Sequence, residues 1–318
     1  MRLRTSMIAK CRVESAAQDT PCCDARHVAG HKQRLYTSGF SGVELVTLSA
    51  TTMGLITAAL YLGSLACYLR KLFAEGRWAG RAATILLAAG LATHYAALLE
   101  RAYAIHSVPY QDLYGSTSLL AWFLVLTYLA LELIHGERAM GAFVLPWVLL
   151  LLVLDLVAAP KQAPVAPARG SIFALHVTSN ILAYSAFTLS FVYSVVYLVQ
   201  DRLLRGRRPV AMMWRLPALE DLEQMTRSGV WVGLGSLVVG IGFGMVVDQQ
   251  LTGAFLQFDP KVIVSFLILG FYALYLTVSK SPAWRGARAS VLCVANYFAV
   301  IFSYTVVNLF LSRFHRFY

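Results

Sequence analysis

The stretch that decides the fold is GVWVGLGSLVVGIGFGMVV, residues 229–247, which contains no charged side chain. About 20 apolar residues in an α-helix cross the roughly 30 Å hydrocarbon core of a bilayer, because each residue adds 1.5 Å. Similar runs recur along the 318 residues. We therefore predict an all-α fold, a polytopic transmembrane helix bundle with about eight spans. The expected spans are 43–69, 82–99, 116–134, 141–158, 172–199, 229–247, 262–278 and 288–311.

The composition excludes a water-soluble globule. Hydrophobic residues make up 58% of the chain and charged residues only 14%, against about 25% charged residues in typical soluble domains. The net charge of +11 does not indicate nucleic acid, since Lys and Arg lie in short clusters between apolar runs. We therefore predict a lipid bilayer as partner and no nucleic acid. None of the five cysteines falls in a Cys-x-x-Cys arrangement, so thioredoxin-like chemistry and covalent haem attachment have no support.

The loops differ in their content of Lys and Arg. Most basic residues of the apolar part lie in the loops 70–81, 135–140, 200–228 and 279–287. The alternate loops hold only Arg101, Lys161, Arg169 and Lys261. Cytoplasmic loops carry the excess of basic residues, so the first set is predicted to be cytoplasmic and the second set to lie on the outer side of the membrane.

The chain divides into two parts of unlike composition. Residues 1–42 are polar and mixed in charge, and we interpret them as a disordered tail or as the product of a misassigned start codon. Residues 43–318 form the predicted transmembrane domain. The topology places the tail outside although it is basic, which conflicts with a simple reading of the charge rule; only Lys32 and Arg34 lie close to the first span.

Three histidines, His106, His176 and His315, fall at outer loops or outer span ends by this topology. A neutral imidazole is an iron ligand, and two imidazoles from different helices can hold a porphyrin iron from both faces. The alternative for each histidine is an ordinary polar residue at the membrane interface.

Five motifs follow one another in a recognisable order. They are AIHSVPYQDLYGS at 104–116, LHVTSNILAYSAF at 175–187, LPALEDLEQMTRSG at 216–229, Asp259-Pro260-Lys261, and FSYTVVNLFLSRFHRFY at 302–318. Through these motifs, the chain resembles the CcsA-type, or ResC-like, haem-handling proteins of cytochrome c assembly, and the resemblance covers residues 90–318. The resemblance implies non-covalent haem b bound at the outer face for presentation to apocytochrome c, together with a ResB/CcsB-like membrane partner. It also implies location in a bacterial cytoplasmic (inner) membrane. It also implies that His176 and His315 are the metal ligands.

The loop before the Asp-Pro-Lys motif departs from the family pattern. The family has a tryptophan-rich loop ending in Trp-Asp-Pro-Lys-Glu, whereas residues 252–262 read TGAFLQFDPKV and contain no tryptophan. Phenylalanine keeps aromatic surface but lacks the indole N–H donor. Thr277 and Gly115 stand where the family has a histidine and a glutamate. The cofactor-binding residues that the resemblance implies are His106, Gly253, Phe255, Phe258, Asp259, Pro260 and Lys261.

Some of these residues have a plainer interpretation. Asp259 as N-cap and Pro260 at the first helical position describe an ordinary helix start, and a lysine at a span end reaches toward the interface. As a haem site, Lys261 would pair with Arg169, Arg313 or Arg316 to neutralise the propionates.

Two functions remain open. No catalytic nucleophile, acid or base is evident, so the first is a non-catalytic haem-handling component of cytochrome c assembly. The second is a divergent paralogue that acts as a permease or as a structural subunit of a membrane complex. The missing tryptophans and Thr277 favour the second, whereas His176, His315 and Asp259-Pro260-Lys261 favour the first.

Overall fold

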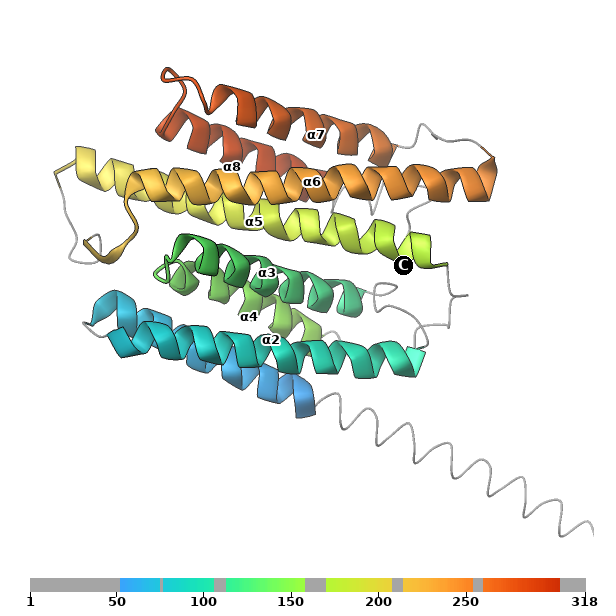
Figure 1. The fold of residues 1–318 in the computed structure, drawn as a ribbon, viewed down its shortest axis with the longest axis horizontal. Coiled ribbons are helices and arrows are strands. Elements are labelled where there is room, and N and C mark those ends of the chain that lie inside the picture. Colours follow the sequence, from blue (N-terminus) through green and yellow to red (C-terminus); the bar gives the residue numbers. More distant parts are fainter. Residues whose placement is uncertain are drawn as a thin grey trace, which may run out of the picture. The chain divides into compact units, whose positions relative to one another are not determined.

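The computed structural model describes residues 52–74, 77–105, 113–157, 170–207, 214–253 and 260–303. Every secondary-structure element in these ranges is helical (Figure 1), which confirms the predicted all-α bundle. The first helix is Thr52–Phe73. It is followed by α2 (Arg77–Ile105), α3 (Leu113–His135), α4 (Gly141–Val157), α5 (Ser171–Arg205), α6 (Leu219–Thr252), α7 (Pro260–Val278) and α8 (Ala287–Phe302).

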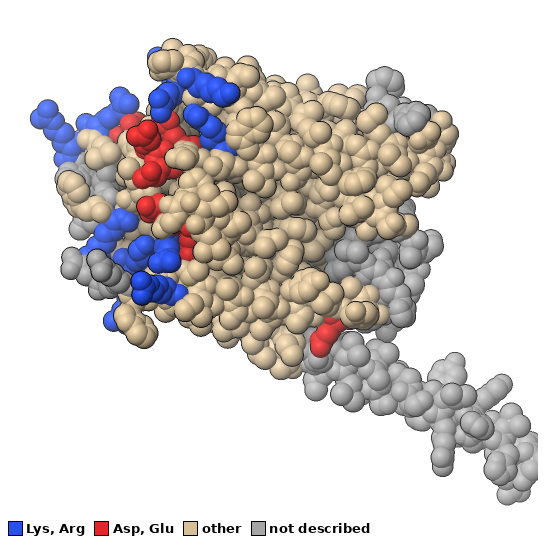
Figure 2. Space-filling model, in the orientation of Figure 1, with Lys and Arg blue, Asp and Glu red and all other residues tan. Residues whose placement is uncertain are grey.

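The outer surface of these helices suits a lipid environment. The first helix, α2, α3, α5 and α6 are long and apolar enough to cross a membrane, and α4, α7 and α8 are shorter apolar helices. Large apolar side chains on their surfaces face outward, among them Ile85, Leu150 and Leu274. On the face shown in Figure 2, Lys, Arg, Asp and Glu gather mostly at one end, and the flank of the bundle carries almost none. This distribution fits a bundle whose flank lies in hydrocarbon.

Several helices are longer than the apolar runs that predicted them. The run 229–247 lies inside α6, which has 34 residues and is therefore about 51 Å long. Its first turn carries Glu220 and Asp221, acidic residues that favour a helix N-terminus but lower the local hydropathy. In the same way, α2 extends beyond the predicted 82–99 at both ends.

The first and last predicted spans are only partly described. The first helix continues to Phe73, four residues past its predicted end, whereas positions 43–51 lie outside the described residues. The last helix is described to Phe302, so the part of its span from 304 onward is outside them too. The predicted tail, 1–42, also lies outside the described residues.

Helix α5 lies at the centre of the packing and contacts α3, α4, α6 and α8. One buried apolar cluster, which includes Tyr68, Leu124 and Tyr193, joins α5 to the earlier helices. A second cluster, which includes Phe187 and Tyr272, joins it to α6, α7 and α8. Figure 1 shows α5 and α6 side by side, with α7 and α8 next to them.

Glycines bring α6 close to α5. A Cβ atom at Gly233 would lie 2.5 Å from the ring of Phe187, so no larger residue fits there without movement. Small residues at helix contacts let backbones approach closely in membrane bundles. Three further glycines of α6 face α5 side chains in the same way: Gly229 faces Ser190, Gly240 faces Asn180 and Gly244 faces His176. This antiparallel register fixes which part of α6 lies opposite the predicted ligand His176.

Candidate functional site

The structure describes only some of the predicted site residues. His176, Gly253 and Pro260 are described, and Lys261 is placed in the first turn of α7 without a described side chain. The remaining predicted residues lie outside the described residues, namely His106, Phe255, Phe258, Asp259 and His315. The geometry of the candidate site is therefore built on His176 and its surroundings.

His176 lies near the start of α5, far from the charged end of the bundle. The last turn of α5 carries Arg202 and Arg205, and Arg205 follows His176 by 29 positions, or about 44 Å of helix. The charged end of Figure 2 is the end at which α5 finishes and α6 begins. His176 is thus at the end of the bundle that carries few charges among the described residues.

The contacts of Nδ1 indicate which ring nitrogen of His176 carries the proton. The Nδ1 atom lies 2.7 Å from the backbone carbonyl oxygen of Gly240 on α6. The amide Nδ2 of Asn180 also lies 3.4 Å from Nδ1 and can only donate, but the carbonyl contact is much shorter and a carbonyl oxygen only accepts. The geometry therefore favours Nδ1 as the donor, and in the neutral ring the lone pair is then on Nε2. Histidines that bind metals commonly donate their other ring N–H to such a carbonyl. His176 therefore has the same kind of Nδ1 partner as many metal-binding histidines.

The space around this imidazole depends on residues of both helices. A Cβ atom at Gly244 would lie 2.8 Å from both Cε1 and Nδ1 of His176. The side chain of Asn180, one turn further along α5, donates from Nδ2 to the backbone carbonyl of His176 at 2.7 Å. Phe173 lies beside the imidazole with ring centroids 6.2 Å apart.

The end of α6 and the start of α7 flank the loop that contains three of the other predicted haem contacts, Phe255, Phe258 and Asp259. Gly253 closes α6 with φ 77° and donates its N–H to the carbonyl of Gln249. This left-handed conformation favours glycine. The helix end therefore explains a glycine at position 253 independently of the predicted binding role. Pro260 is the first residue of α7, as the plainer interpretation of the Asp-Pro-Lys motif expects. Thr277, at the position of the family's histidine, is exposed and donates to Leu274 in its own helix.

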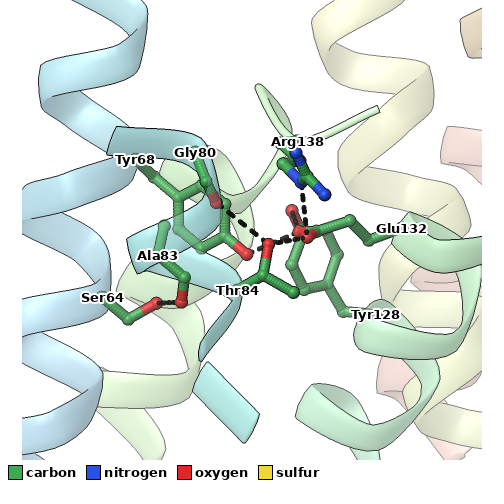
Figure 3. A network of polar contacts seen from close by, with 8 residues as sticks. All are labelled: Ser64, Tyr68, Gly80, Ala83, Thr84, Tyr128, Glu132 and Arg138. Carbon is green, nitrogen blue, oxygen red and sulfur yellow. Dashed lines mark hydrogen bonds and ion pairs between the residues drawn. The ribbon is translucent and has the colours of Figure 1, made fainter. Parts of the chain in front are cut away.

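The structure also shows a buried carboxylate that the motif analysis missed. Glu132 of α3 is 2% exposed. It accepts hydrogen bonds from the hydroxyls of Tyr68 at 2.5 Å and Tyr128 at 2.7 Å, and from Thr84 at 2.5 Å. The Nε atom of Arg138 lies 3.7 Å from the same carboxylate, and Figure 3 shows these side chains converging on it. Glu132 therefore ties together the first helix, α2, α3 and the start of the loop to α4.

A second buried polar group joins the same helices nearer the middle of the bundle. His94 of α2 is 2% exposed. Its Nε2 lies 3.1 Å from the hydroxyl of Ser118 on α3, and its Nδ1 lies 3.4 Å from the hydroxyl of Tyr61 on the first helix. Ionisable residues inside membrane spans are rare and mark functional or structural positions. Glu132 and His94 can therefore both be recognised as such positions from the sequence alone. Both side chains have partners on neighbouring helices, as structural residues do.

Comparison with known proteins assigns this chain to a family. The profile of the family described as "Cytochrome C assembly protein" matches residues 110–315. Protein HemX of Brevibacillus brevis is 28% identical over 225 residues, which are 70% of this chain and 82% of that protein. The cytochrome c biogenesis protein CcsA of Synechococcus sp. (strain CC9605) is 28% identical over 240 residues, 67% of this chain and 79% of that protein. CcsA of Chlamydomonas reinhardtii is 24% identical over 217 residues, 66% and 60% of the two chains. The chain thus belongs to the cytochrome c assembly protein family.

Proposed function

We propose that this protein binds haem b at the extracytoplasmic end of its helix bundle and presents it for attachment to apocytochrome c. The observation that carries the proposal is the hydrogen bond from His176 Nδ1 to Gly240, because it leaves the lone pair on Nε2, the atom that binds iron. In this proposal His315 is the second axial ligand. Haem supplies the reactive chemistry, and the chain supplies binding and orientation.

The rest of the proposed site comes from the loop between α6 and α7. Gly253 ends α6 nine positions after Gly244, or about 14 Å further along the helix. The loop therefore begins on the same end of the bundle as His176. In the proposal Phe255 and Phe258 form the apolar wall of the haem pocket, and Lys261 neutralises a propionate. Haem binding in proteins combines such apolar walls with a few polar groups.

The proposed setting is the bacterial cytoplasmic membrane, with a ResB/CcsB-like protein and apocytochrome c as partners. Membership of the cytochrome c assembly family supports it. The segregation of charged side chains to the end opposite His176 supports an outward-facing site.

The test is the absorption spectrum of the detergent-purified protein after expression with abundant haem. The native protein should retain haem, and His176→Ala should change the Soret band or lower the haem content. His315→Ala should do the same. The matched control is His135→Ala: this histidine lies at the end of α3 and contacts Ser228 at 3.2 Å, so its loss should leave the spectrum unchanged. If the native protein stays haem-free, or both single variants keep the native spectrum, the proposal is wrong.

A further inference from the structure

The imidazole of His176 lies in a recess on α6 that is formed by the backbone at Gly240 and Gly244. Gly240 and Gly244 are four positions apart and face the same side of α5, as residues one turn apart on a helix do. The carbonyl of Gly240 accepts the ring proton of His176 at 2.7 Å. The missing side chain of Gly244 leaves the space that the imidazole occupies.

The recess is specific to these two glycines and is not a general property of α6. A Cβ atom at Gly235 or Gly242 would meet nothing within 4 Å, so these glycines have no comparable contact. At Gly240 a Cβ atom would lie 2.8 Å from Nδ2 of Asn180, the side chain that donates to the backbone of His176. A methyl group at position 240 or 244 would therefore disturb the neighbourhood of the imidazole, whereas one at 242 would not.

We propose that Gly244 is a positioning residue: its lack of a side chain holds His176 in the Nδ1–H tautomer, hydrogen-bonded to Gly240, so that Nε2 is the iron-binding atom. Partners that orient a metal-binding histidine affect binding strongly, and their mutation commonly lowers affinity by about 10- to 100-fold. The inference rests on the proposed role of His176 for its consequence in haem binding. The tautomer itself is a property of the haem-free protein.

The first experiment needs no haem. Nitrogen NMR of the protein with ¹⁵N-labelled histidine distinguishes a protonated ring nitrogen from one with a lone pair, and His176→Ala identifies the signals of His176. The native protein and Gly242→Ala should show the Nδ1–H tautomer. Gly244→Ala should lose it, because the new methyl group would lie 2.8 Å from Nδ1. An Nε2–H tautomer in the native protein overturns the inference, whether or not the variants fold.

The second experiment measures haem retention in the same four proteins after a check of helix content and unfolding temperature. Gly244→Ala should retain about 10- to 100-fold less haem, or show the altered spectrum of His176→Ala, while Gly242→Ala matches the native protein. A native spectrum in folded Gly244→Ala, together with an altered one in His176→Ala, overturns the inference and leaves the proposed function standing. Equal losses in Gly242→Ala and Gly244→Ala also overturn it, because helix packing would then explain both. A native spectrum in His176→Ala overturns the proposed ligand instead.

Discussion

Replacing Glu132 with leucine should destabilise the bundle by about 1 to 3 kcal/mol. The substitution removes the acceptor of two buried tyrosine hydroxyls, those of Tyr68 and Tyr128. A buried donor without a partner costs about 1 to 3 kcal/mol in soluble proteins, but hydrogen bonds within membrane bundles average only about 0.6 and reach about 1.7 kcal/mol. The smaller scale applies here, and two bonds give the stated range. Thr84 adds little, since its single hydroxyl hydrogen can be donated instead to the carbonyl of Gly80, 3.0 Å away.

The assay is reversible unfolding in mixed micelles with increasing denaturing detergent. A thiol reagent adds a local measurement, because Cys67 is partly buried beside Tyr68 on the first helix and should react faster when that helix loosens. The matched control is Glu220→Leu, which removes an exposed glutamate from the first turn of α6 and should change stability by less than about 1 kcal/mol.

A compensating variant makes the reasoning about Glu132 sharper. Removing both partners of a buried hydrogen bond is less harmful than removing one. Glu132→Leu combined with Tyr68→Phe and Tyr128→Phe should therefore recover at least about half of the lost stability. Glu132 does not have this stabilising role if Glu132→Leu is as stable as Glu220→Leu, or if the triple variant is no more stable than Glu132→Leu alone.

Two further predictions concern the loop between α6 and α7 and the topology. Thr252→Trp, Leu256→Trp and Phe258→Trp together should raise haem retention, because they add apolar surface and indole donors. Overpacking would oppose this by about 1 to 3 kcal/mol per misfit, so folding is measured alongside haem content. A folded variant without haem argues for the permease or structural alternative. Single cysteines at Gln257 and Arg313, in a variant without native cysteines, should react with a membrane-impermeant thiol reagent from outside the cell; reaction only from the cytoplasm would refute the topology.

The sequence predicts the fold well because one physical constraint dominates it. An apolar run long enough to cross a bilayer must be helical, so the existence of each helix follows from hydropathy. The helix ends do not. α6 begins at Leu219, ten positions before the predicted start at 229, because a helix continues past the hydrocarbon wherever packing and capping support it.

The candidate site is predictable only in part, for a related reason. The Leu-His-Val motif singles out His176, but its partner Gly240 is 64 positions away. Only the glycine-mediated register of α5 on α6 brings the two together. Glu132 is different: a carboxylate inside the predicted span 116–134 indicates a functional or structural position by itself, although it belongs to none of the five motifs.

The surroundings of Glu132 and His176 suggest separable roles for the two polar groups. The carboxylate of Glu132 accepts hydrogen bonds from side chains of three helices, so its hydrogen-bonding capacity is directed to holding those helices together. His176 donates through one ring nitrogen to the backbone of a neighbouring helix, and the neutral ring carries its lone pair on the other nitrogen. Loss of Glu132 should therefore lower stability without changing the spectrum of bound haem, whereas loss of His176 should change the spectrum at little change in stability. The opposite pattern would mean that the helix contacts around Glu132, and not the α5–α6 recess, determine how haem is bound.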